Sequence, residues 1–162
     1  MCSTTVGGMA HTPADLNSEA LDFLTERHLG SLTTLRSNGL PHVVAVGFTW
    51  DQDAGIARVI TSDGSQKVRN AERTGYATVF QVERARWLAL EGPAVVRREP
   101  EAVRVAENRY AYRYRQPRVN PKRVVIEISV SRILGSRSLF GETGDSLGGS
   151  AFVSGRTDRR SE

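Results

Sequence analysis

Cysteine and lysine are both scarce in this chain of 162 residues. The single cysteine, Cys2, has no second cysteine to bond with, which excludes a disulfide within the chain. Lysine occurs twice, at Lys67 and Lys122, whereas arginine occurs 20 times. A lysine close to a turn therefore stands out, because its flexible point charge differs from the planar fork of arginine.

Long apolar segments and familiar nucleic-acid motifs are missing as well. No segment approaches the roughly 20 apolar residues that a membrane-spanning helix needs, and residues 1–15 lack the apolar run of a secretion signal. We therefore expect a cytoplasmic protein that does not enter a membrane. Helix-turn-helix, RNP, KH and zinc-ligand patterns are absent, so we expect neither a nucleic acid nor a metal as partner. The net charge of +4 favours anionic partners without choosing among them.

The composition is typical of one soluble domain, with 39% hydrophobic and 25% charged residues. Residues 1–15 are small and polar, and residues 136–162 are rich in glycine, serine and charge. This pattern predicts a mobile N-terminal tail, a domain over about 16–135, and a disordered C-terminal tail.

Turn and capping signals divide the domain into strands and helices. Asn17 or Ser18 can cap a first helix, and Asn38-Gly39 favours a hairpin between strands at 29–36 and 41–50. Further strands are predicted at 56–62, 76–83, 86–99 and 123–134, with helices at about 65–73 and from Pro100 onward. Six strands joined by hairpins, with three inserted helices, predict a mainly β protein with a closed or split antiparallel barrel.

The predicted strand 41–50 has one bulky and one small face. Its even positions carry large side chains, whereas its odd positions, such as Ala45 and Gly47, become small, so a flat ligand could lie there. Gly47 marks either the close approach of a ligand or another backbone, or a bulge or barrel corner, with a bulge or corner as the favoured interpretation. His42 is interpreted as a partly buried, hydrogen-bonded histidine rather than a metal ligand.

The ten residues 61–70, TSDGSQKVRN, contain the strongest functional signal. Here a β-like run breaks at Asp63-Gly64, and Ser65 is positioned to cap a short helix. Unpaired N–H groups at a helix start, together with hydroxyls and the ammonium of Lys67, form an anion cradle. The other interpretation is an ordinary strand-to-helix junction with a solvated lysine.

The segment 109–123 mixes three tyrosines with five arginines and the second lysine. Such a mixture can bind single-stranded nucleic acid. However, Ala106, Tyr110 and Tyr114 share a helical stripe that more simply packs on the barrel. The candidates for a rim that attracts an anionic substrate are Arg109, Arg113, Arg115 and Arg118.

The ordered set PHVVAVGFT, ITSDGSQK and NPKRVVIEI resembles the split-barrel superfamily of pyridoxamine 5′-phosphate oxidases and deazaflavin-dependent reductases. Within it, the chain is most similar to the branch of F420-dependent biliverdin reductases. The resemblance spans about 16–135. It implies a homodimer of six-stranded barrels, with coenzyme F420 in each of two grooves at the subunit interface.

The resemblance also assigns residues to parts of this cofactor, a deazaflavin with a phosphodiester and an oligoglutamate tail. The ring would lie along Val43, Val44, Ala45 and Val46. The phosphate and the start of the tail would contact Thr61, Ser62, Ser65, Gln66 and Lys67, with Asn70 as a further candidate. Trp87 is either an aromatic wall from across the dimer interface or a buried core residue.

The implied reaction is hydride transfer from reduced F420 to a conjugated acceptor. The expected acceptor is biliverdin, which is reduced to bilirubin. A catalytic triad is neither needed nor seen, and no catalytic side chain is assigned. Two alternatives stay open: an FMN-dependent enzyme of the pyridoxamine phosphate oxidase type, and a carrier that binds F420 without turnover.

Overall fold

A computed structural model describes residues 10–141 of the chain. Most of the two predicted tails, 1–15 and 136–162, lies outside the described residues. The described parts of both segments contact the domain, since His11 forms a β-bridge with Ile133 and the side chain of Leu139 is fully buried.

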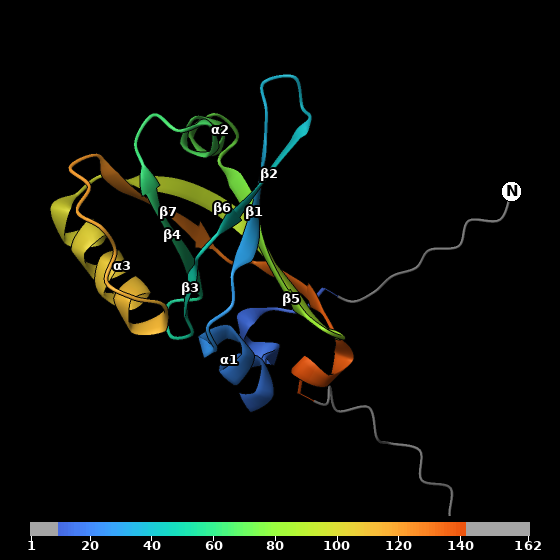
Figure 1. Cartoon of the computed structure of the whole chain (residues 1–162). Helices are drawn as coiled ribbons and strands as arrows, with labels where there is room; N and C mark the ends of the chain where they lie inside the picture. Colours follow the sequence, from blue (N-terminus) through green and yellow to red (C-terminus); the bar gives the residue numbers. More distant parts are fainter. Residues whose placement is uncertain (1–9, 142–162) are drawn as a thin grey trace, which may run out of the picture.

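The domain is built on an antiparallel sheet with the strand order β2-β1-β5-β6-β7-β4-β3, and β8 pairs with β6 (Figure 1). The strands are β1 (Gly30–Leu35), β2 (Pro41–Val46), β3 (Thr49–Asp51), β4 (Ile56–Ser62), β5 (Tyr76–Glu83), β6 (Arg86–Arg97), β7 (Arg123–Ser129) and β8 (Arg132–Gly135). The mainly β, antiparallel prediction is confirmed. Within residues 10–141 the number of strands is eight instead of six, and the sheet is not closed, because β2 and β3 end the path without pairing to each other.

One extra strand arises because the predicted strand 41–50 breaks at Gly47. Before the break β2 pairs with β1, and after it β3 pairs with β4 at the opposite end of the path. A Cβ atom on Gly47 would lie 2.8 Å from a ring carbon of Tyr110 and 3.2 Å from one of Tyr114. The corner interpretation of Gly47 is therefore correct, and the small residue makes room for two tyrosines.

The other extra strand arises where the predicted strand 123–134 divides into β7 and β8. Both pieces pair with the long strand β6, β8 along its first half and β7 along its second half. The crossing point is Gly92, where a Cβ atom would lie 2.0 Å from the carbonyl oxygen of Ser129. Only glycine permits this approach of two backbones.

Three α-helices begin where the capping signals predict. They are α1 (Ser18–Thr25), α2 (Gln66–Thr74) and α3 (Pro100–Arg113), with short 3₁₀ turns at Pro13–Asp15 and Arg137–Leu139. The side-chain oxygen of Asn17 accepts a 3.0 Å hydrogen bond from the backbone N–H of Ala20, and α2 ends at Gly75 in the left-handed conformation. Figure 1 shows α2 and α1 at opposite ends of the sheet and α3 along one side. In the described range, no helix combines the length and apolarity that a membrane crossing requires.

The two faces of the half-sheet β2-β1-β5-β6-β8 differ in burial. Its inner face supplies core side chains such as Leu32 and Leu90, and α1 and α2 close over it. On its outer face Val43 is 60% exposed, Val82 53% and Trp87 36%. The described residues thus leave apolar side chains of this outer face in contact with water.

Candidate functional site

The strand-to-helix turn lies where the sequence predicts it, between β4 and α2. Thr61 and Ser62 end β4, and Gly64 adopts a left-handed φ of 71°. The carboxylate of Asp63 accepts a hydrogen bond of 2.9 Å from the backbone N–H of Gly64 and pairs with Arg98 at 2.8 Å. The hydrogen bonds from Arg98 lower the pKa of Asp63, so this carboxylate stays ionised at neutral pH and its negative charge is paired with Arg98.

Ser65 immediately precedes α2 and leaves its side chain unused. Its hydroxyl makes no capping hydrogen bond, and its Oγ atom is buried without a partner in the described residues. A buried hydroxyl without a partner is costly, so the position favours an additional acceptor or donor. The first turn of α2 also presents unpaired N–H groups, which suits a phosphate oxygen.

Gln66, Lys67 and Asn70 lie on the first turns of the same helix. Gln66 and Lys67 are half-buried, whereas Asn70 is fully buried. The amide oxygen of Asn70 accepts a 2.8 Å hydrogen bond from Gln66, and its nitrogen donates to the hydroxyl of Thr34 at 3.1 Å. Asn70 is thus placed to orient Gln66, and its direct contact with a ligand stays a prediction.

Strand β2 divides the four predicted ring contacts between its two faces. Val43 and Ala45 point outward and are exposed, whereas Val46 is buried and Val44 packs against the core. Within residues 10–141, β2 pairs only with β1, so its other edge carries backbone N–H and C=O groups outside the ladder. An exposed, small-residue surface beside a free strand edge fits a planar ring with a polar border.

Trp87 lies on the same outer face but on a different strand. Its ring centroid is 6.0 Å from that of Phe80, and its exposure excludes a buried core position. Three strand spacings of about 4.8 Å separate β6 from β2, which puts Trp87 at least about 14 Å from the predicted ring position. Within one chain, the structure therefore does not bring Trp87 together with Val43 and Ala45.

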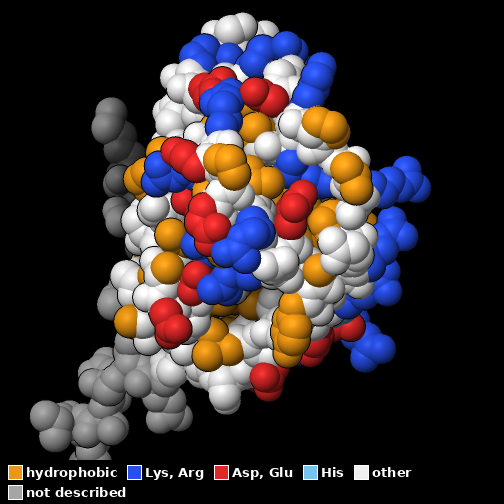
Figure 2. All heavy atoms as spheres, turned by 90° about the vertical axis from the view of Figure 1, so that its left-hand side faces the viewer, with side chains coloured by type: hydrophobic (Ala, Val, Ile, Leu, Met, Phe, Trp, Pro, Cys, Tyr) orange, Lys and Arg blue, Asp and Glu red, His pale blue; other side chains and the backbone are white. Residues whose placement is uncertain are grey.

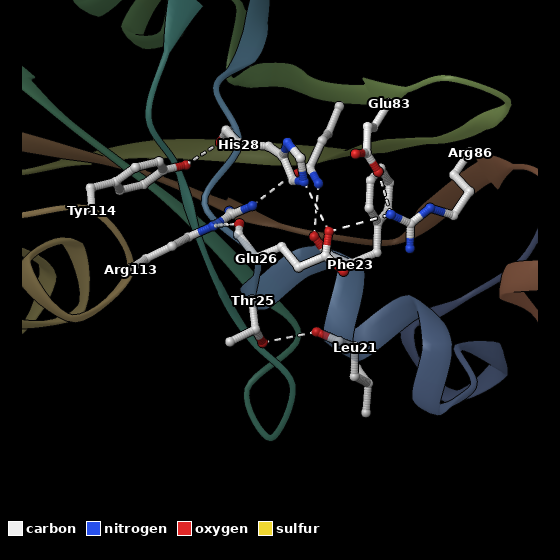
Figure 3. A network of polar contacts seen from close by, with 10 residues as sticks. Leu21, Phe23, Thr25, Glu26, His28, Glu83, Arg86, Arg113 and Tyr114 are labelled. Atoms are coloured by element: carbon white, nitrogen blue, oxygen red, sulfur yellow. Dashed lines mark hydrogen bonds and ion pairs between the residues drawn. The ribbon is translucent and has the colours of Figure 1, made fainter.

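Arg113 is a correction to the sequence analysis, because it is buried rather than part of a rim. Its guanidinium donates to the carbonyl oxygen of Glu26 at 2.9 Å (Figure 3). It also donates to the carbonyl oxygen of Phe48 (2.6 Å) and to the side-chain oxygen of Gln81 (2.7 Å). Burial lowers the pKa of Arg113. The sequence did contain a signal, since Arg113 follows the buried Ala106 by seven residues and so shares its helix face.

Tyr114 and His28 belong to the same junction, which the sequence analysis missed as a unit. The Tyr114 hydroxyl donates to the carbonyl oxygen of His28 at 2.7 Å and accepts from the N–H of Phe48 at 3.2 Å. Burial raises the pKa of Tyr114. Because α1 ends at Thr25, His28 lies beyond the helix and pairs with Glu26 at 2.9 Å. The hydrogen bond from His28 is the main cause that lowers the pKa of Glu26.

Glu26, His28 and Glu83 form a cluster of potential metal ligands within 4.8 Å of one another. Arg86 donates to the carboxylates of both Glu26 and Glu83, so its positive charge offsets part of their negative charge (Figure 3). The ion pair between Arg86 and Glu26 joins the segment after α1 to the β5–β6 hairpin.

The other predicted rim arginines differ among themselves. Arg109 pairs with the buried Asp51 at 2.8 Å, whereas Arg115 and Arg118 are exposed. Asp51 also pairs with Arg58 at 2.9 Å. On this α3 side, acidic and basic side chains are interspersed over the middle of the face, and basic ones gather along one edge (Figure 2). Arg115 and Arg118 thus stay candidates for substrate contact.

Two surface hollows of similar size lie on different parts of the molecule. One of about 520 Å³ lies between α1, β3 and α3 and is lined by Leu24, Trp50 and Tyr112 among others. The other, of about 530 Å³, lies beside the turn before α2 and includes Gly64 and Lys122. We favour the second region as the site, because Gly64 in its lining directly precedes Ser65, whose buried hydroxyl has no partner in the described residues.

Comparisons with known proteins show the family to which this chain belongs. The family model for pyridoxamine 5′-phosphate oxidase matches residues 16–136. The F420H(2)-dependent biliverdin reductase of Mycobacterium tuberculosis (strain CDC 1551 / Oshkosh) is 59% identical over 132 residues, covering 82% of this chain and 96% of that protein. A conserved hypothetical protein from Mycobacterium tuberculosis has a similar fold (TM-score 0.65, 24% identity, 77% of this chain and 88% of that one). So does an F420 reductase (TM-score 0.58, 23% identity, 70% and 94%). The chain belongs to the pyridoxamine 5′-phosphate oxidase family.

Proposed function

We propose that this chain is an F420-dependent oxidoreductase that reduces biliverdin to bilirubin. The observation that carries the proposal is the 59% identity to a biliverdin reductase over nearly all of that protein's length. The matched range is long enough to include the whole described domain apart from a few residues. Both the cofactor and the acceptor are therefore inferred from this relative.

The turn before α2 supports the cofactor assignment on chemical grounds. Ser65 offers a buried hydroxyl without a partner in the described range. Lys67, on the first turn of α2, offers a positive charge that is not paired with a carboxylate among the described residues. With Thr61, Ser62 and Gln66, these groups would bind the phosphodiester and the start of the glutamate tail. Bound in reduced form, F420 supplies a hydride.

The outer face of β2 would hold the ring. Val43 and Ala45 give it an apolar surface, and the free edge of β2 offers backbone groups for the polar border of the pyrimidine. Two planar π-systems held in register can gain roughly 7–11 kcal/mol of barrier reduction from positioning alone. The chain's contribution to the reaction is therefore mainly orientation, and we assign no side chain as proton donor.

A homodimer would complete this site. The outer face of β2-β1-β5-β6-β8 exposes Val43, Val82 and Trp87, and a second copy packed there would remove these side chains from water. Trp87 of that second copy would then reach the ring that Trp87 of the same chain cannot approach. The aromatic wall requires the dimer, because only a second copy would bring Trp87 to the ring.

The acceptor would meet positive charge at the mouth of the groove. Arg115 and Arg118 are exposed at the end of α3 and in the loop that follows it, and biliverdin carries two carboxylates. Exposed arginines can pair such groups in two-pronged fashion and raise their local concentration.

Titration with F420 and with FMN, followed by turnover with biliverdin, tests the proposal. We expect saturable F420 binding, weaker FMN binding, and bilirubin formation that depends on reduced F420. A protein that binds FMN tightly and ignores F420 would instead be an FMN enzyme. Binding of F420 without turnover of biliverdin or another conjugated acceptor would indicate a carrier. Sedimentation at micromolar concentration would test the dimer separately.

A further inference from the structure

Asn120 approaches the turn before α2 from the loop between α3 and β7. Its side-chain nitrogen donates to the hydroxyl oxygen of Ser62 at 2.8 Å, and its side-chain oxygen accepts from the backbone N–H of Lys122 at 3.0 Å. The second bond determines which way the amide points, because a backbone N–H can only donate and needs the oxygen opposite it. The nitrogen must therefore face Ser62.

This orientation determines the role left for Ser62. A hydroxyl oxygen that accepts from Asn120 keeps its own hydrogen free to donate in another direction. Ser62 is exposed at the end of β4, beside the start of α2, so that hydrogen is available to an incoming anion.

The backbone around this contact is held on both sides. The β4–β7 ladder runs up to the pair Ser62 and Arg123, and the N–H of Asp63 donates to the carbonyl oxygen of Lys122 at 2.8 Å. The carbonyl oxygen of Asn120 accepts from the N–H of Arg123 at 3.0 Å. Backbone hydrogen bonds therefore fix the positions of Asn120 and Ser62 relative to each other.

We infer that Asn120 is a positioning residue that makes Ser62 a hydrogen-bond donor to the phosphate of F420. The inference rests on the proposed function, because it concerns the same anion site. Asn120 itself makes its two side-chain bonds within the protein and acts through Ser62.

The test measures F420 affinity and thermal stability for four variants of the full chain: Asn120→Ala, Asn120→Asp, Ser62→Ala, and the double variant Ser62→Ala with Asn120→Ala. Asn108→Ala, an exposed asparagine on α3, is the matched control. In Asn120→Asp the carboxylate still accepts from Lys122 but also accepts from Ser62, so the hydroxyl hydrogen turns away from the phosphate. The new negative charge also repels that phosphate.

We expect Asn120→Ala to weaken F420 binding about 3- to 10-fold and Asn120→Asp to weaken it further, with Asn108→Ala unchanged. For thermal stability we expect the opposite order: Asn120→Asp should be more stable than Asn120→Ala, because it keeps the hydrogen bond from the backbone N–H of Lys122. In the Ser62→Ala background, Asn120→Ala should change the affinity by less than about 2-fold.

Three outcomes would overturn the inference. If Asn120→Asp binds F420 as tightly as Asn120→Ala or more tightly, Asn120 supports the loop only. If the losses of Ser62→Ala and Asn120→Ala add in the double variant, Asn120 does not act through Ser62. If the unaltered chain takes up no F420, the proposed function fails and the inference fails with it; the first two outcomes leave the proposed function intact.

Discussion

Polar groups are concentrated in two regions of this molecule, the junction around Arg113 and the turn before α2. At the junction, Arg113 and Tyr114 donate to acceptors in the segment after α1, in β5 and at the Gly47-Phe48 corner. At the turn, Ser65 has a buried hydroxyl with no partner in the described range. In the first region the hydrogen bonds join separate segments of the fold. In the second region the hydroxyl of Ser65 forms no hydrogen bond within the described residues.

The difference teaches that residue type alone does not identify a binding site. The four arginines at 109–118 are predicted from the sequence to form a rim for anions, yet Arg113 is enclosed and Arg109 is paired with Asp51. The sequence predicts that Ser65 caps a helix within an anion cradle, and in the structure its buried hydroxyl makes no capping bond and has no partner among the described residues. The feature that separates the regions is whether the protein itself satisfies each polar group.

The largest effect is expected from removing the buried side chain of Arg113, which joins the junction. Arg113→Ala should lower the free energy of unfolding by about 3–4 kcal/mol, because Gln81 and the two carbonyl oxygens lose their donor. Arg115→Ala, the exposed neighbour, should stay within about 0.5 kcal/mol of the unaltered chain. Urea unfolding of both variants measures the contrast. If instead Arg113→Ala folds normally and only raises the KM for biliverdin, Arg113 belongs to the rim after all.

A bulky side chain on the outer face of β2 should prevent cofactor binding there. Ala45→Leu is expected to abolish F420 binding, because the added bulk fills the surface proposed for the ring. The free energy of unfolding should change by less than about 1 kcal/mol, since Ala45 is exposed. Ala54→Leu, at an exposed alanine in the β3–β4 turn, serves as control. Loss of folding in Ala45→Leu would place that residue in the packed core.

Removing the lysine of α2 should weaken the cofactor site without affecting the fold. Lys67→Ala is expected to reduce the binding free energy of F420 by about 1.5–3 kcal/mol, the range for hydrogen bonds to charged groups. Arg104→Ala, which removes an exposed charge on α3, should leave the affinity unchanged. Fluorescence titration measures both. An unchanged affinity in Lys67→Ala would remove this residue from the site.

Acid should weaken the α3 side through Asp51. Burial alone would raise the pKa of Asp51, but hydrogen bonds from Arg58 and the N–H of Ala54, with the charge of Arg109, lower it below its ordinary value of 3.8. The ionised form thus stabilises the fold above that value, and this contribution is lost as the pH falls through the lower, folded-state pKa.

The variant Asp51→Asn should therefore be less stable than the unaltered chain at pH 7, by about 1–2 kcal/mol. The difference should shrink below pH 3.8. Asp53→Asn, at an exposed position nearby, is the control. Thermal unfolding across this pH range decides the matter, and a constant difference between Asp51→Asn and the unaltered chain would contradict the assignment.

The smallest expected effect concerns Arg115 and Arg118, the two arginines that stay candidates for substrate contact. Salt should raise the KM for biliverdin about 2- to 3-fold, since exposed charges are screened beyond roughly 8 Å at physiological ionic strength. The double variant Arg115→Ala with Arg118→Ala should show the same rise at low salt and keep kcat, because such contacts hold ground and transition states alike. Arg84→Ala with Arg104→Ala is the matched control. A KM that responds to neither salt nor substitution would exclude both arginines from the rim.

Local signals located most elements of the fold and the turn of the site. The hairpin at Asn38-Gly39, the cap at Asn17 and the start of α3 at Pro100 all lie within a few residues of their signals. Capping and turn preferences depend on neighbours in the chain, so a pattern of five to ten residues contains them. The breaks within 41–50 and 123–134 were missed because they depend on contacts with α3 and with the opposite strand.

The sequence by itself determined the mainly β class, the order of the elements and the position of the polar turn before α2. The tertiary structure alone decided which polar groups are satisfied. The three acceptors of Arg113 lie 87, 65 and 32 residues away in the chain, and Asn120 contacts Ser62 across 58 residues. The physical reason is that burial and hydrogen-bond partners arise from segments distant in sequence, and no local pattern specifies which of these segments will meet.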